Sequence, residues 1–135
     1  MKQTSKRVIY FEDDKDMVEL VRIILGREGY QVEGIAEGQA GIKAVQQNSP
    51  DVVLLDLMLP DMDGWEIYRQ LKHEESTADI PVIVITAKAQ SIDKVLGLEI
   101  AKVDDYISKP FRPNELVDRV EEVLAGRKKK RENDK

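Results

Sequence analysis

The feature that most constrains the fold is a regular alternation of short apolar runs with longer stretches of helical periodicity. Residues 52–55 and 82–85 are apolar at every position, which is typical of strands that are buried on both faces. Between such runs, apolar residues recur at the spacing of an amphipathic helix. Strict alternation of strands and helices predicts a parallel sheet with helices on both faces. We therefore expect a three-layer, doubly wound α/β fold built on a five-stranded parallel sheet.

The elements can be placed by their periodicity and by their boundary residues. Gly29 follows the first helix, where a residue in the left-handed conformation often ends a helix, and Gly38 and Gly41 weaken the pattern of the second helix. We expect one domain over residues 1–126 and a charged, disordered tail over residues 127–135. Strands are expected at residues 8–11, 30–35, 51–56, 81–86 and 103–108, and helices at residues 14–28, 37–47, 64–75, 92–101 and 113–125.

Composition excludes several classes of site. The chain has no cysteine and one histidine, His73, so disulfides, zinc–thiolate sites and thiol catalysis are excluded. Its formal net charge of -5 argues against a dedicated nucleic-acid surface. No apolar run is long enough for a signal peptide or a membrane span. We expect a cytoplasmic protein that contacts neither nucleic acid nor membrane, with the basic run 127–131 solvated.

Polar residues gather where the strands of the predicted sheet end. In doubly wound sheets, ligands bind at the carboxyl ends of the strands. Carboxylates held close together repel one another unless a cation lies among them, and oxygen donors with open coordination positions favour Mg²⁺. A carboxylate nucleophile beside a metal, an ammonium and a hydroxyl suits phosphoryl transfer onto aspartate. The residues at these ends are Glu12, Asp13 and Asp14 after the first strand, Asp56 after the third, Thr86 in the fourth and Lys109 after the fifth.

These residues resemble the receiver domain of two-component response regulators. The resemblance rests on Glu12-Asp13, Asp56, Thr86-Ala87 and Lys109-Pro110-Phe111, in that order, and on the segment DLMLPDMDG at residues 56–64. It covers about residues 6–126 and is closest to the receivers of winged-helix transcription regulators. It implies a flavodoxin-like sheet with the strand order 2-1-3-4-5.

The resemblance also implies roles for individual residues. A sensor histidine kinase or a phosphotransfer protein would phosphorylate Asp56, and the domain would assist only its own phosphorylation and dephosphorylation. Asp13, Asp56 and the backbone carbonyl of Met58 would bind Mg²⁺, and Glu12 would act through water. The register of the first strand makes Glu12 and Asp13 the acid pair and leaves Asp14 to begin the helix.

Further residues would carry the signal away from Asp56. Thr86 and Lys109 would contact phosphoryl oxygens, and Tyr106 would turn inward on activation. The Lys109–Pro110 peptide is expected to be cis. The face formed by the fourth helix, fifth strand and fifth helix would relay the signal to a protein target or an effector domain, or support a phosphorylation-dependent homodimer. Its expected ion pairs across the two-fold axis are Lys94 with Glu115 and Asp105 with Arg119.

Three other functions are alternatives to the phosphorylation switch. A phosphatase with an aspartate nucleophile needs a second acid two residues later, where this chain has Met58. An interaction domain that ignores phosphate need not keep the acids and the lysine. A flavin-binding protein would have a phosphate loop rich in Gly, Ser and Thr, whereas residues 12–14 are acidic. The sequence leaves open whether this chain acts alone or belongs to a longer regulator.

Overall fold

The computed structural model describes residues 5–87 and 103–133. The helix expected at residues 92–101 lies outside these ranges. Within them, the strands and helices follow the expected order, and most boundaries agree to within about two residues. The elements are β1 (Lys6–Phe11), α1 (Lys15–Gly26), β2 (Tyr30–Ile35), α2 (Gly38–Asn48), β3 (Val52–Leu55), α3 (Gly64–His73), β4 (Val82–Thr86), β5 (Asp105–Ser108) and α6 (Pro113–Asn133).

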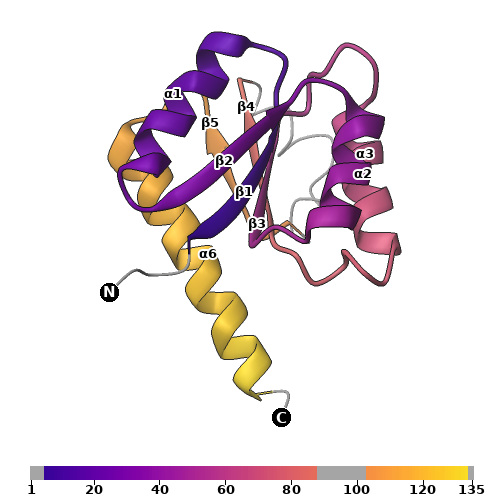
Figure 1. Cartoon of the computed structure of the whole chain (residues 1–135), viewed down its shortest axis with the longest axis vertical. Helices are drawn as coiled ribbons and strands as arrows, with labels where there is room; N and C mark the ends of the chain where they lie inside the picture. Colours follow the sequence, from indigo (N-terminus) through magenta and orange to yellow (C-terminus); the bar gives the residue numbers. More distant parts are fainter. Residues whose placement is uncertain (1–4, 88–102, 134–135) are drawn as a thin grey trace.

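The five strands form one parallel sheet in the order β2-β1-β3-β4-β5. This confirms the predicted fold and strand order. Helices α1 and α6 cover one face of the sheet, and α2 and α3 cover the other (Figure 1). No helix in the described part of the chain is long and apolar enough to cross a membrane.

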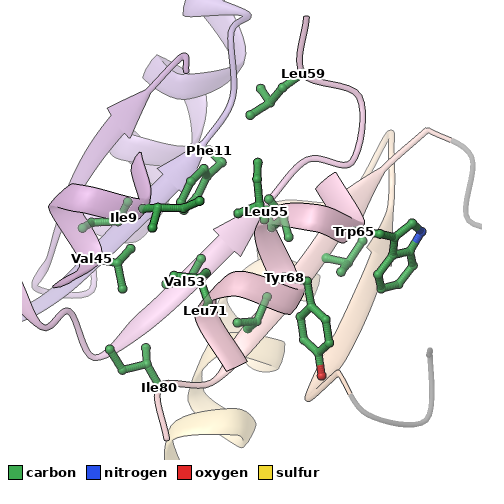
Figure 2. Packing of buried hydrophobic residues seen from close by; sticks show 14 residues of the cluster. Ile9, Phe11, Val45, Val53, Leu55, Leu59, Trp65, Tyr68, Leu71 and Ile80 are labelled. Carbon is green, nitrogen blue, oxygen red and sulfur yellow. The ribbon is translucent and has the colours of Figure 1, made fainter. Parts of the chain in front are cut away.

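Each face of the sheet has its own hydrophobic core. On the side of α2 and α3, Phe11, Val53 and Leu55 pack with Leu71 (Figure 2). Residues of β3 that alternate with these, such as Leu54, enter the core beneath α1 and α6. Every residue of β3 and β4 is buried, because successive side chains of a strand point to opposite faces. This explains the two continuous apolar runs in the sequence.

The glycines that weaken the sequence pattern of α2 are a packing requirement. A Cβ atom on Gly41 would overlap the ring of Phe11, and one on Gly38 would crowd Met62. Both glycines are buried. The absence of side chains therefore lets α2 lie close against β1, at the expense of helix propensity.

The structure differs from the sequence prediction at the end of the chain. Helix α6 continues to Asn133. The expectation of a disordered tail is therefore wrong for residues 127–133. Lys, Arg and Glu have good helix propensity, and a single Gly126 inside the helix costs about 1 kcal/mol. The Arg127 Nη1 atom donates to the Asp51 carbonyl at 2.9 Å. This contact holds the first part of the extension against the amino end of β3.

Candidate functional site

The register of the sheet brings the expected site residues to one edge. Phe11 pairs with Leu55, so Glu12 and Asp56 leave their strands at the same level, and the Asp56 amide donates to the Phe11 carbonyl at 3.0 Å. Thr86 pairs with Ser108 on the next strands. The Lys109 amide donates to the Thr86 carbonyl at 3.0 Å, which brings the lysine to the same edge.

Lys109 joins two buried carboxylates at this edge. Its Nζ atom lies 2.6 Å from Glu12 Oε1 and 2.9 Å from Asp56 Oδ2. Glu12 and Asp56 are only 3% and 5% exposed. Two anions so poorly hydrated need a nearby cation, and the ammonium supplies one positive charge for the pair.

The protonation of this group follows from its burial and its hydrogen bonds. Burial raises the pKa of Glu12, although the hydrogen bond from Lys109 opposes that shift. Burial by itself would lower the pKa of Lys109, but hydrogen bonds to Asp56 and Glu12 outweigh it, so the pKa of the ammonium is raised. Lys109 therefore stays protonated at neutral pH and remains a donor to both carboxylates.

The three acids after β1 have different surroundings. Asp14 Oδ1 accepts hydrogen bonds from the amides of Asp16 at 3.0 Å and Met17 at 3.2 Å, which makes Asp14 the N-cap of α1. This confirms that Asp14 begins the helix. Asp13 is exposed, whereas Glu12 is buried. Glu12 and Asp13 thus remain as the acid pair at the sheet edge.

The sequence reasoning missed one residue of this cluster, Tyr10. Its hydroxyl donates to Glu12 Oε1 at 3.0 Å, and its side chain is fully buried. Tyr10 stands two residues before Glu12 in the same strand, so the two side chains share a face of the sheet. That spacing, together with a hydroxyl inside an apolar strand, was the available signal.

The acids in and before the loop after β3 have different roles: two of them bind the ends of helices, and only Asp56 belongs to the site. Asp56 Oδ1 accepts from the Met58 amide at 2.9 Å, and Met58 is 55% exposed. Asp61 accepts from the Gly38 amide at 3.0 Å, and Asp63 caps α3 through the Trp65 amide at 3.2 Å. Asp61 and Asp63 therefore hold α2 and α3 in place, while Asp56 faces Lys109.

The expected switch residues lie along β4 and β5. Thr86 is fully buried at the end of β4. Tyr106 is partly buried and packs against the core on the side of α2 and α3, next to Val84 in the sheet. The Lys109–Pro110 peptide is cis, as the resemblance implied. The two expected switch residues thus lie on neighbouring strands, Thr86 in β4 and Tyr106 in β5.

The charged residues expected to pair between two copies are arranged differently in one chain. Arg119 Nη1 lies 2.7 Å from Asp105 Oδ1 of the same chain, and hydrogen bonding to Asp105 raises the pKa of Arg119. Packing of α6 against β5 brings the two together. Glu115 lies in the first turn of α6, and Lys94 lies outside the described residues. An ion pair between copies would therefore involve an Arg119 that already has a partner in its own chain.

The donors at the edge fit a hard cation better than a soft one. Within residues 5–87 and 103–133, no three His, Cys, Asp or Glu side chains are grouped so that they could hold a metal unaided. Mg²⁺ does not need such a group, because it keeps several waters and uses few protein ligands. Asp56 and the exposed Asp13 offer carboxylate oxygens, and Met58 offers a carbonyl. The residues present therefore fit Mg²⁺ bound largely through water.

Comparison with known proteins identifies the family. The model of the response regulator receiver domain matches residues 8–121. The chain belongs to this family. As a receiver domain, it is a signalling protein whose activity depends on phosphorylation, and the structural cluster described above occupies the edge of the sheet that the resemblance indicated.

Individual relatives agree with this assignment. The DNA-binding response regulator MtrA of Mycobacterium tuberculosis is 42% identical over 120 residues, which are 89% of this chain and 51% of MtrA. This receiver domain thus spans about half the length of that relative. Its resemblance to receivers of transcription regulators is thereby confirmed.

Two solved structures share the fold. A receiver domain protein from Methanospirillum hungatei is 29% identical with a TM-score of 0.84, over 94% of this chain and 99% of that one. The receiver domain of the sensor histidine kinase PA1611 from Pseudomonas aeruginosa is 26% identical with a TM-score of 0.82, over 90% and 99%. The PA1611 domain carries a magnesium ion in its active-site cleft.

Proposed function

We propose that Asp56 accepts a phosphoryl group from a sensor histidine kinase or a phosphotransfer protein, and that this chain is the resulting signalling switch. The observation that carries the proposal is the bridge from Lys109 Nζ to Asp56 Oδ2 at 2.9 Å and to Glu12 Oε1 at 2.6 Å. It holds an ammonium beside the oxygen that would attack phosphorus. A cytoplasmic location is part of the same proposal.

Each residue of the site would have a separate role in the reaction. The Met58 amide binds Asp56 Oδ1 at 2.9 Å and leaves Oδ2 directed at Lys109. When the phosphoryl group arrives, the lysine can pair with one of its oxygens, and the Thr86 hydroxyl can donate to another. Asp13, Asp56 and the Met58 carbonyl would hold Mg²⁺, with Glu12 acting through water. The bound ion would neutralise phosphoryl charge next to the carboxylates.

The chain acts on itself in this proposal and not on a separate substrate. Asp56 gains and loses the phosphoryl group, and the surrounding residues assist both steps. The position two residues after Asp56 is Met58, which cannot serve as a general acid. This is the feature that speaks against a phosphatase acting on other molecules.

Intact mass measurement tests the proposal directly. The protein is incubated with Mg²⁺ and acetyl phosphate, and we expect one phosphoryl group on the parent and none on Asp56→Ala. Asp61→Asn is the matched control, because Asp61 lies in the same loop but binds the Gly38 amide, and it should still be labelled. A chelator should abolish labelling. Labelling of Asp56→Ala equal to the parent would refute the proposal.

A second step of the proposal is the response to phosphorylation. Thr86 would move toward the phosphoryl group, and Tyr106 would turn into the space that it leaves. We expect Thr86→Ala to be phosphorylated but to show a weaker conformational change. NMR spectra of β5 would test this. If phosphorylated Thr86→Ala and phosphorylated parent shift β5 equally, Thr86 is not the switch.

The output of the switch is proposed to pass through the surface that includes β5 and the start of α6. A phosphorylation-dependent homodimer would use Lys94, Asp105, Glu115 and Arg119, and a downstream protein or an effector domain is the other partner that this surface could serve. Sedimentation with Mg²⁺ and beryllofluoride, a phosphoryl mimic, tests the dimer. A monomer at tens of micromolar, or a dimer unaffected by Arg119→Glu, would exclude it.

A further inference from the structure

Tyr10 connects the hydrophobic core to the acidic edge of the sheet. Its ring is fully buried among the residues that α1 and α6 cover. Its hydroxyl lies at the polar end of this core and donates to Glu12 Oε1 at 3.0 Å. Because residues two apart in a strand share a face, β1 directs the ring and the Glu12 carboxylate to the same side of the sheet.

The Glu12 carboxylate is held from three directions. Oε1 accepts from the Tyr10 hydroxyl and, at 2.6 Å, from Lys109 Nζ. Oε2 accepts from the Asp14 amide at 3.0 Å. The Asp14 amide belongs to the backbone and the Tyr10 hydroxyl is buried, so both donors have little freedom to move. The position of Glu12 therefore helps to determine where the flexible Lys109 ammonium lies, and Lys109 in turn contacts Asp56.

Packing alone does not account for a tyrosine at this position. The other buried side chains of this core are aliphatic, and a phenylalanine ring would fill almost the same volume. A buried phenol hydroxyl needs a hydrogen-bond partner to offset its desolvation, and here the partner is a carboxylate of the candidate site. Hydrogen bonds to charged groups are stronger than those between neutral groups.

We propose that Tyr10 is a positioning residue of the phosphoacceptor site, whose hydroxyl holds the Glu12 carboxylate where it orders Lys109 and the water shell of Mg²⁺. The inference rests on the proposed function, because it concerns the same edge. Tyr10 itself touches neither Asp56 nor the metal in this scheme. It acts through Glu12, as outer residues of metal sites act through the ligands that they orient.

The first test removes the hydroxyl and keeps the ring. Tyr10→Phe should bind Mg²⁺ about ten-fold more weakly than the parent in calorimetry, which is the lower end of the loss seen for such outer residues. Tyr30→Phe is the matched control. Tyr30 packs against the same core but lies at the far end of the sheet, paired with Lys6, and its affinity should be unchanged. Equal affinities for Tyr10→Phe and parent would overturn the inference.

A double-mutant cycle separates positioning from a general loss of stability. In Glu12→Asp, the side chain is shorter by one C–C bond, about 1.5 Å, and we expect its carboxylate to lie beyond hydrogen-bond distance of the Tyr10 hydroxyl. Tyr10→Phe should then weaken Mg²⁺ binding by less than two-fold in the Glu12→Asp background. An equal ten-fold loss in both backgrounds would show that the hydroxyl acts by some route other than Glu12.

Metal-free NMR decides the question without phosphorylation or Mg²⁺. The side-chain carboxyl ¹³C signal of Glu12 and the ammonium ¹⁵N signal of Lys109 should shift in Tyr10→Phe and stay in place in Tyr30→Phe. Unchanged signals in Tyr10→Phe would refute the positioning role even if Asp56 is phosphorylated. Conversely, failure to label Asp56 in the parent would refute the proposed function, while these signals would still show whether Tyr10 positions Glu12.

Discussion

The two edges of the same parallel sheet use their charged residues in different ways. At the carboxyl edge, Glu12 and Asp56 are buried and share one cation, Lys109. At the amino edge, Asp51 Oδ2 accepts from the Arg7 amide at 2.7 Å, and Asp104 Oδ2 accepts from the Val82 amide at 2.8 Å. Each of these amino-edge acids thus accepts from the amide of a neighbouring strand, whereas Glu12 and Asp56 share the Lys109 ammonium and also accept from the Asp14 and Met58 amides.

This difference shows how one sheet separates stability from chemistry. Asp51 and Asp104 each complete the hydrogen bonding of a neighbouring strand by accepting from its amide. Two buried carboxylates that share one ammonium still carry an excess negative charge, so a second cation is favoured beside them. The amino edge is thus expected to respond to mutation through folding alone, and the carboxyl edge through both folding and Mg²⁺.

Removal of Lys109 should have the largest effect. Lys109→Ala leaves Glu12 and Asp56 buried without their cation, and we expect a loss of about 3 kcal/mol in the free energy of unfolding without Mg²⁺. Mg²⁺ should restore part of this loss because it neutralises the same carboxylates. Urea unfolding with and without Mg²⁺ measures both quantities. A loss that Mg²⁺ leaves unchanged would contradict the described role of the carboxyl edge.

Removal of Asp51 should have a smaller effect of a different kind. Asp51→Ala deprives the Arg7 amide of its acceptor, and we expect a loss of about 1 kcal/mol. The loss should be the same with and without Mg²⁺, and labelling of Asp56 should be retained. Urea unfolding and intact mass measurement check the two statements. A loss that changes with Mg²⁺ would show that the two edges are not independent.

The smallest effect is expected at the exposed ion pair between β5 and α6. Arg119 and Asp105 have side chains that are 39% and 20% exposed, so solvent screens their attraction. Arg119→Ala should lower the free energy of unfolding by about 0.5 kcal/mol or less, and high salt should remove the difference. A loss above that of Asp51→Ala would mean that this pair is a structural contact and not one that a partner could replace.

The sequence by itself determined the architecture and the location of the site. Continuous apolar runs at residues 52–55 and 82–85 predicted strands buried on both faces, and the acids and lysine at the strand ends predicted the charged edge. These inferences succeed because side-chain periodicity reports directly which faces of an element are buried. The segment at residues 56–64 carried the resemblance, although its acids Asp61 and Asp63 turned out to bind helix ends.

Only the tertiary structure decided which charged groups meet. Glu12 and Lys109 are 97 positions apart, and their contact depends on strand register and on the path of the chain after β5. The Tyr10 hydroxyl, the Asp105–Arg119 pair within one chain and the contact of Arg127 with the Asp51 carbonyl depend on packing in the same way. Periodicity assigns a residue to a face, but distances of about 3 Å between side chains are set by how the elements pack.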